Sequence, residues 1–181
     1  MPASPPQKMN GAILELPGEI RNHIYAMAIY PDLSSIVIAN CTKPEHLAAS
    51  VLHLPLFRVC RQIRAECISY VCATFHLRIL GLQTAIVFFN CAGTAVSEIK
   101  AFALVQPAMS ILESTESRDR VNYFFAALDR MDELNEVILE GTGRMPTLEQ
   151  GEKQMEFVRR LKDFSQGGMN VQVRFGEEWV L

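Results

Sequence analysis

Apolar side chains follow helical spacing in two segments of the first half of the chain. One segment begins near Ile13, accommodates Pro17 in its first turn and ends at Pro31, and steps of three or four place its apolar residues on one face. The second begins at Pro55 and keeps the helical period for four turns. The first stripe consists of Ile13, Leu16, Ile20, Ile24 and Met27, and the second of Leu56, Val59, Cys60, Ile63, Cys67, Tyr70 and Val71.

Two shorter segments of the same half have the pattern of strands. Ser35 to Ala39 is short and β-branched, and Thr74 to Leu80 alternates between apolar and polar residues. Asn40 to Ser50 has neither periodicity, so we expect a surface connection there. The first half therefore combines two helices with two strands.

The second half repeats a unit of one strand and one helix. Helices are predicted at 82–91, 118–131 and 147–164, and strands at 99–105, 136–140 and 171–175. The strand centres Ala103, Ile138 and Val173 are 35 residues apart in both cases, with a helix between them. This spacing predicts right-handed βαβ units with parallel strands. The expected fold class is α/β or α+β, with helices packed on a small sheet that βαβ units continue.

The pattern indicates one domain after a short leader. Residues 1–12 are rich in proline, and we expect them to be disordered. Residues 13–181 are expected to form a single domain with two halves, 13–80 and 81–181. A domain boundary normally shows several exposed Pro, Gly or polar residues, whereas Gly81 is the only break here.

Composition and charge exclude several classes of protein. The chain has 181 residues, 49% of them hydrophobic, and its net charge of -3 provides no basic field for nucleic acid. The most apolar stretch, Leu82 to Val96, falls short of the roughly 20 apolar residues that a membrane-spanning helix needs. The five cysteines form no C-x-x-C pair, and residues 1–10 lack the apolar core of a secretory signal. We therefore expect reduced thiols, no membrane segment and a cytoplasmic or nuclear location.

Three motifs between residues 13 and 80 resemble a family of fungal F-box-like proteins. They are Leu-Pro-Gly-Glu-Ile-Arg-Asn-His-Ile-Tyr at 16–25, Val-Cys-Arg-Gln-Ile-Arg-Ala-Glu at 59–66 and Phe-His-Leu at 75–77. Beyond Gly81 the chain resembles this family in rhythm only. A wider resemblance is to the F-box itself, whose helices dock a Skp-type adaptor and recruit proteins to a cullin ubiquitin ligase.

The resemblance implies F-box-like helices and a partner-binding surface at Leu16, Pro17, Ile20 and Ile24. The leading hypothesis is a non-catalytic protein-interaction module of the F-box type, acting as a substrate adaptor of a ubiquitin ligase. Tyr30 to Pro55 occupies the place where an F-box has only a short turn and helix. Two alternatives therefore stay open: the stripe belongs to the core, or the protein is a stand-alone domain that binds another protein, itself or a small ligand without a ligase.

Charged residues on the two signature helices are interpreted as structural ion pairs. These residues are Glu19, Arg21, Arg61, Arg64 and Glu66. Arginine suits this role because its planar guanidinium bonds a carboxylate through two N–H groups. The alternative is a catalytic or anion-binding role.

No metal, cofactor or catalytic group is expected. Cys60 and Cys67 are two helical turns apart, about 10.5 Å, which is too far for one tetrahedral ion. Cys72 and His76 alone do not complete a metal site. The glycine-rich connection at 141–144 matches no phosphate-binding motif, and no histidine accompanies a hydrolase nucleophile motif. The sequence thus predicts a protein that is not an enzyme.

Overall fold

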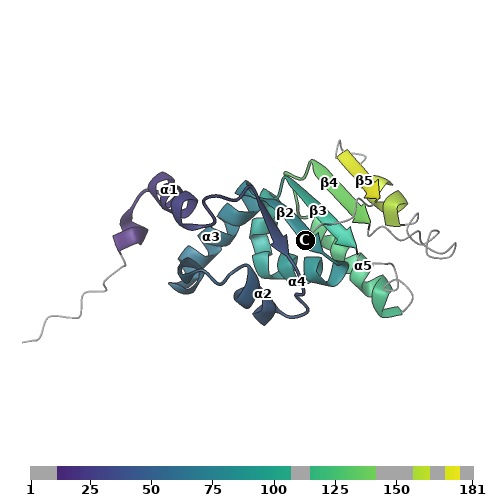
Figure 1. The fold of residues 1–181 in the computed structure, drawn as a ribbon, viewed down its shortest axis with the longest axis horizontal. Coiled ribbons are helices and arrows are strands. Elements are labelled where there is room, and N and C mark those ends of the chain that lie inside the picture. Colours follow the sequence, from purple (N-terminus) through teal and green to yellow (C-terminus); the bar gives the residue numbers. More distant parts are fainter. Residues whose placement is uncertain (1–11, 107–114, 142–156, 164–169, 176–181) are drawn as a thin grey trace, which may run out of the picture.

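The computed structural model of the chain describes residues 12–106, 115–141, 157–163 and 170–175 (Figure 1). The protein has a mixed α/β fold. Its α-helices are α1 (Gly18–Ala28), α2 (Pro44–Ser50), α3 (Arg61–Thr74), α4 (Leu82–Ala92), α5 (Thr115–Leu128) and a helical segment at 157–163, and its 3-10 helices are η1 (Ala12–Glu15), η2 (Pro55–Arg58) and η3 (Gly93–Glu98). The strands are β1 (Ser35–Ile38), β2 (His76–Leu80), β3 (Ala101–Gln106), β4 (Glu136–Gly141) and β5 (Asn170–Phe175).

The five strands form one parallel sheet in the order β1-β2-β3-β4-β5. Ala103 lies opposite Ile138, and Ile138 lies opposite Gln172, one residue before the predicted centre Val173. The parallel βαβ arrangement predicted for the second half is confirmed. It also extends to β1 and β2, for which spacing alone made no prediction.

The helices that connect parallel strands in sequential order lie on one face of the sheet when the crossovers are right-handed. In agreement, α4 packs on β2 and β3 and also contacts α2, α3 and α5. The apolar core lies between this helical layer and the sheet and includes Ile36, Leu77, Phe102 and Val137 in one cross-strand row. The opposite face carries an ion pair between Arg78 and Glu140, which spans β3 with an N–O distance of 2.7 Å.

Both halves of the chain contribute to this sheet and this core. Strand β2 of the first half pairs with β3 of the second, and α4 follows β2 directly. Gly81 makes the abrupt turn between them with a φ of 88°, which is costly for any residue with a Cβ atom. The prediction of a buried helix after Gly81 is confirmed, since most of α4, including Phe88 and Phe89, is buried.

The first predicted helix is wrong in its start and in its buried face. Residues 12–15 form a separate 3-10 turn, and α1 begins at Gly18 with Pro17 as its N-cap. Tyr25 and Ile29 are fully buried, whereas Ile20 and Met27 of the predicted stripe are 50% and 61% exposed. Periodicity locates an apolar stripe, but it does not determine whether another element covers that stripe.

Two further expectations for the first half are corrected. The helix predicted from Pro55 is broken at Val59 and Cys60, because Cys60 is extended and caps α3 by accepting a hydrogen bond from the Ile63 amide. The expected surface connection at Asn40 to Ser50 contains α2 instead. Leu47 is the buried residue of α2, and one large apolar residue in two turns leaves no periodic signal.

Several expectations concern residues outside the described part of the chain. They include the leader, apart from Ala12 at the start of η1, the start of the last helix at Thr147, and the glycine-rich connection beyond Gly141.

Candidate functional site

Of the residues predicted to bind a partner, Ile20 and Ile24 lie on α1, and Leu16 and Pro17 come directly before it. Pro17 is exposed, Leu16 and Ile24 are half-buried, and Ile20 and Met27 are among the most exposed large apolar residues of the described chain. We call these five residues the α1 stripe. Figure 1 shows α1 at the end of the molecule opposite β5.

A cluster of hydrogen bonds fastens the inner face of α1 to α3. The guanidinium of Arg21 donates to both Glu66 carboxylate oxygens, at 2.8 Å and 3.1 Å, and the Tyr25 hydroxyl donates to Oε2 at 2.8 Å. Gln62 also donates to Glu66, at 3.0 Å, and Arg21 also donates to the Leu16 carbonyl. We call this cluster the α1–α3 clasp. It decides which face of α1 stays free.

The clasp keeps Glu66 charged. The Arg21 guanidinium lowers the pKa of Glu66 below its ordinary value, and hydrogen bonds from Tyr25 and Gln62 act in the same direction. Burial and the Glu66 carboxylate raise the pKa of Tyr25, so its hydroxyl remains a proton donor. At neutral pH, Glu66 therefore accepts bonds from one cation and from two neutral donors.

The other predicted pairing residues are not brought together. Glu19 is exposed on α1, and Arg61 and Arg64 are exposed on α3. Within the described ranges, the ion pairs are Arg21–Glu66 and Arg78–Glu140, so Glu19, Arg61 and Arg64 lack an ion-pair partner there. Arg61 and Arg64 instead line a hollow beside α3.

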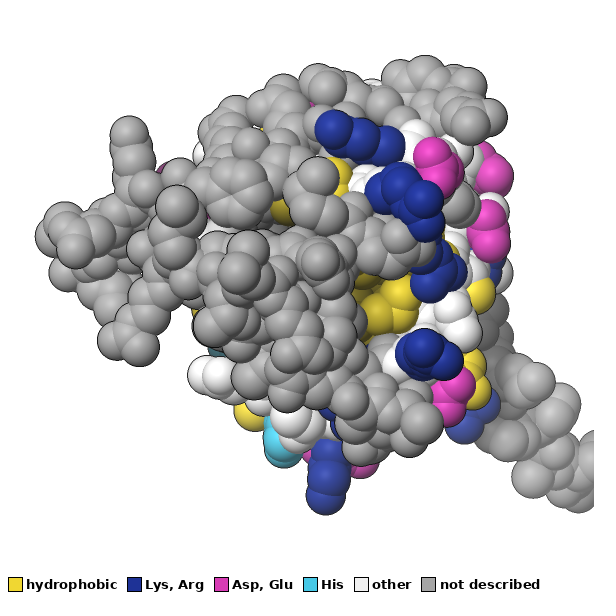
Figure 2. Space-filling model, turned by 90° about the vertical axis from the view of Figure 1, so that its right-hand side faces the viewer, with side chains coloured by type: hydrophobic (Ala, Val, Ile, Leu, Met, Phe, Trp, Pro, Cys, Tyr) yellow, Lys and Arg dark blue, Asp and Glu magenta, His cyan; other side chains and the backbone are white. Residues whose placement is uncertain are grey.

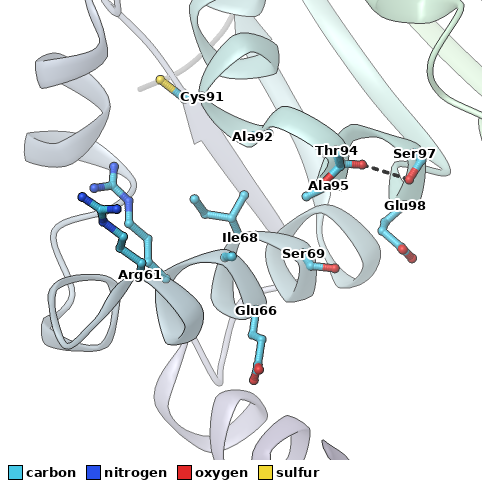
Figure 3. A pocket seen from close by; sticks show the side chains of 12 residues that line it. Arg61, Glu66, Ile68, Ser69, Cys91, Ala92, Thr94, Ala95, Ser97 and Glu98 are labelled. Carbon is cyan, nitrogen blue, oxygen red and sulfur yellow. Dashed lines mark hydrogen bonds between the residues drawn. The ribbon is translucent and has the colours of Figure 1, made fainter.

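This hollow lies between α3 and the junction of α4 with η3, and its volume is about 560 Å³. We call it the α3 groove. Figure 3 shows its lining, which consists of Arg61, Arg64, Ala65, Glu66, Ile68 and Ser69 from α3 and Cys91, Ala92, Thr94, Ala95, Ser97 and Glu98 from the facing segment. The groove has the size of a ligand pocket.

The polarity of the α3 groove changes along its length. The arginines lie at the end formed by the first turns of α3, and Ser69, Ser97 and Glu98 lie toward the other end (Figure 3). The carboxylate of Glu66 points away from the groove, toward the clasp. The chemistry that this arrangement offers is anion binding at one end and hydroxyl hydrogen bonding at the other.

Sequence reasoning did not find the groove. Arg61 and Arg64, three residues apart on one helix, share a side of α3, and that spacing was the available signal. Most of the facing wall comes from η3, whose short 3-10 turns have no periodicity, and the rest comes from the end of α4.

The cysteines behave as separate groups. Cys60 is exposed and Cys91 is half-buried, whereas Cys41, Cys67 and Cys72 are buried. Burial raises the pKa of Cys67 to about 11 and that of Cys72 to about 12. These two thiols are therefore protonated and poorly nucleophilic at neutral pH. In the described ranges no group of three His, Cys, Asp or Glu side chains is placed to hold a metal ion.

Comparisons with known proteins add no family. The chain matches no protein-family model, and neither a curated protein nor a solved structure shows significant similarity to it. Among the described helices, none combines the length and the apolar character that crossing a bilayer requires.

Proposed function

We propose that this protein is a non-catalytic interaction module that docks on a protein partner through the α1 stripe. The observation that carries this proposal is the exposure of Ile20 and Met27, at 50% and 61%, on a helix whose opposite face is fastened by the clasp. Exposed apolar residues scattered singly need no explanation. Aligned on one helix face, they form the kind of surface that amphipathic helices use in protein recognition.

The clasp supports a docking role because it presents the stripe in one orientation. A helix of eleven residues is marginal by itself in water, so α1 depends on its attachment to α3. Arg21 and Tyr25 provide that attachment through directional bonds to Glu66. A preorganised helix loses less conformational entropy on binding than a flexible one.

The proposed partner is a Skp-type adaptor of a cullin ubiquitin ligase. Support comes from the resemblance of residues 16–25 and 59–66 to the F-box signatures and from the exposure of the stripe that corresponds to the adaptor-binding segment. In this role the protein would act as a substrate adaptor. The alternative function is a stand-alone domain that uses the same stripe for another protein or for a second copy of itself.

The test is calorimetric titration of the full chain with a purified Skp-type adaptor. We expect saturable binding that Ile20→Asp weakens by about tenfold or more, because a charge on the docking face must be desolvated. Tyr123→Asp is the matched control, since Tyr123 is 66% exposed on α5, far along the chain from α1. Its affinity is expected to match that of the wild-type protein.

Two outcomes contradict parts of this proposal. If the adaptor does not bind at all, the ligase role is wrong, and light scattering then shows whether the wild-type protein associates with itself. If the adaptor binds and a folded Ile20→Asp variant binds equally well, the α1 stripe is not the interface.

A further inference from the structure

The two arginines of the α3 groove differ in their pairing from the two arginines that form ion pairs between elements of the fold. Arg21 and Arg78 each pair with a glutamate, at 2.8 Å and 2.7 Å. Arg61 and Arg64 are exposed, and neither forms an ion pair or a side-chain hydrogen bond with another described residue. The groove therefore has two guanidinium groups available at one end (Figure 3).

The position of these arginines in α3 is electrostatically unfavourable without an anion. Arg61 is the first residue of the helix, and the first turn contains no acidic residue. The N-terminal end of a helix carries partial positive charge, so cations there are destabilising. An anionic group bound at this end of the groove would offset both the helix dipole and the two guanidinium charges.

Basic side chains elsewhere do not offer the same chemistry. Figure 2 shows Lys and Arg side chains in a row on the face at the β5 end of the molecule, with Asp and Glu side chains beside them. Arg160, on the helical segment at 157–163, donates to Asn122 and lies over the Phe125 ring. Arg159 and Lys162 of the same segment also have interaction partners. The α3 groove is thus the better candidate for binding an anion.

The rest of the groove indicates a ligand larger than a simple anion. Its apolar wall includes Ile68 and Ala92, which are largely buried, and its far end carries Ser69, Ser97 and Glu98. Arg61 and Ser69 are eight residues apart on α3, a span of about 12 Å at 1.5 Å per residue. An extended peptide rises about 3.3 Å per residue, so three or four residues cover that distance.

We propose that the α3 groove binds an extended acidic peptide segment of a protein partner. Carboxylates of the segment pair with Arg61 and Arg64, its apolar side chains lie against Ile68 and Ala92, and its other end reaches the hydroxyl groups and Glu98. Charge complementarity identifies the occupant, because the available charges at one end are positive and Glu98 favours a basic group at the other. This site is distinct from the α1 stripe, because Arg61 and Arg64 take no part in the clasp, although Glu66 belongs to both the clasp and the groove lining.

The experiment follows backbone amide shifts of the full-length protein by NMR during titration with a peptide pool. The pool contains pentapeptides with two glutamates, one leucine, one alanine and one lysine in every order. A second pool has glutamine in place of glutamate, and inorganic phosphate is titrated separately. We expect the glutamate pool to shift amides of α3 and η3, and the glutamine pool to shift them far less.

The decisive variant is Arg61→Gln with Arg64→Gln. We expect it to weaken binding of the glutamate pool by about tenfold, as for the loss of two exposed charge pairs. It should also melt at a temperature no lower than that of the wild-type protein, because the cations removed are unpaired at a helix N-terminus. Lys100→Gln with Arg118→Gln is the matched control, because it removes the same charge from exposed positions outside the groove and should bind the pool normally.

Four results would overturn the peptide proposal. The first is no shift of α3 and η3 amides with the glutamate pool, and the second is an equal response to the glutamine pool. The third is that phosphate displaces the glutamate pool completely and that neither titrant shifts the amides of η3. This result would indicate a site for a small anion only. The fourth is equal loss of binding in the control variant. None of these results depends on the α1 stripe, so failure here is distinguishable from failure of the adaptor proposal.

Discussion

The N-terminal and C-terminal regions of the protein each contain an aromatic cluster, and the two clusters are built differently. The N-terminal cluster joins α1, α3 and the start of β2 and consists of Tyr25, Tyr30, Tyr70 and Phe75. The C-terminal cluster joins α4, β3, α5 and the helical segment at 157–163 and consists of Phe88, Phe89, Phe102, Phe124, Phe125 and Phe157.

The tyrosines add directional bonds that the phenylalanines cannot make. Tyr25 donates to Glu66, and Tyr30 donates to the Val51 carbonyl at 2.7 Å. Phe102 and Phe124 pack edge to face in an environment without polar partners. The N-terminal cluster therefore combines buried rings with directional polar contacts, and the C-terminal cluster is held by buried apolar area alone.

The difference extends to the surface. In the described chain before β2, five large apolar residues are exposed, namely Ile20, Met27, Leu33, Val37 and Val59, whereas after Gly81 the corresponding residue is Tyr123. The hydrogen bonds of the clasp position α1 on α3 without any described element covering its apolar stripe. Both regions contribute to one core, and the N-terminal region also exposes the apolar stripe on which the proposed docking role rests.

The largest effect should come from separating the two regions. A chain that ends at Gly81 lacks β3 and α4, so β2 loses one of its two neighbouring strands and the buried side chains of Leu77 and Ile79 become exposed. We expect this fragment to show no cooperative unfolding, because the apolar area left cannot offset the entropy of ordering the chain. The full chain should unfold in one calorimetric transition. A cooperatively folded fragment, or two separate transitions of the full chain, would show that the regions are independent.

The next largest effect should come from the C-terminal aromatic cluster. Phe102 is fully buried, and its ring centroid lies 5.7 Å from that of Phe89 and 6.3 Å from that of Phe124. We expect Phe102→Ala to lower the free energy of unfolding by about 3 to 5 kcal/mol, measured by urea denaturation. A loss below about 1 kcal/mol would mean that the cluster does not dominate stability.

The clasp should have a smaller effect that depends on pH. Glu66→Gln removes the negative charge that accepts hydrogen bonds from Arg21 and Tyr25. We expect this variant to lower the free energy of unfolding by about 1 to 2 kcal/mol at neutral pH. Because the folded pKa of Glu66 is lowered, its stabilising effect is complete above the unfolded pKa of about 4.3 and disappears as the pH falls through the folded pKa. The difference in unfolding free energy between wild type and variant should therefore shrink in acid. A difference that is constant with pH would exclude this electrostatic origin.

The smallest effect should come from Ile20 of the α1 stripe, for which the buried Ile63 of α3 is a matched control. Ile20 is 50% exposed on α1, and Ile63 is 1% exposed on α3. We expect Ile20→Ala to change the unfolding free energy by no more than about 0.5 kcal/mol, and Ile63→Ala to lower it by about 2 to 5 kcal/mol. Thermal melts of both variants make this comparison. Equal losses would place Ile20 in the core and remove the basis of the docking surface.

Much of the fold could be predicted because local patterns there agree with tertiary packing. The equal intervals between the predicted strand centres, among them Ala103 and Ile138, favoured parallel βαβ units, and these strands are parallel. The alternation of apolar and polar residues around Leu77 and Ile79 correctly predicted which face of β2 is buried. Prediction failed where a single contact decides the structure. Leu47 is the buried residue of α2, and the extended Cys60 cap separates η2 from α3.

The sequence by itself determined the mixed α/β class and the parallel strands of the second half, because periodicities of two and 3.6 residues distinguish strands from helices and equal strand spacing across a helix favours parallel βαβ units. Tertiary structure alone decided that Glu66 holds Arg21 and Tyr25, that Ile20 faces solvent, and that Arg61 and Arg64 border a groove with η3. The physical reason is that the spacing of residues along a helix or strand fixes which side chains share one of its faces. What lies opposite that face depends on residues distant in the chain.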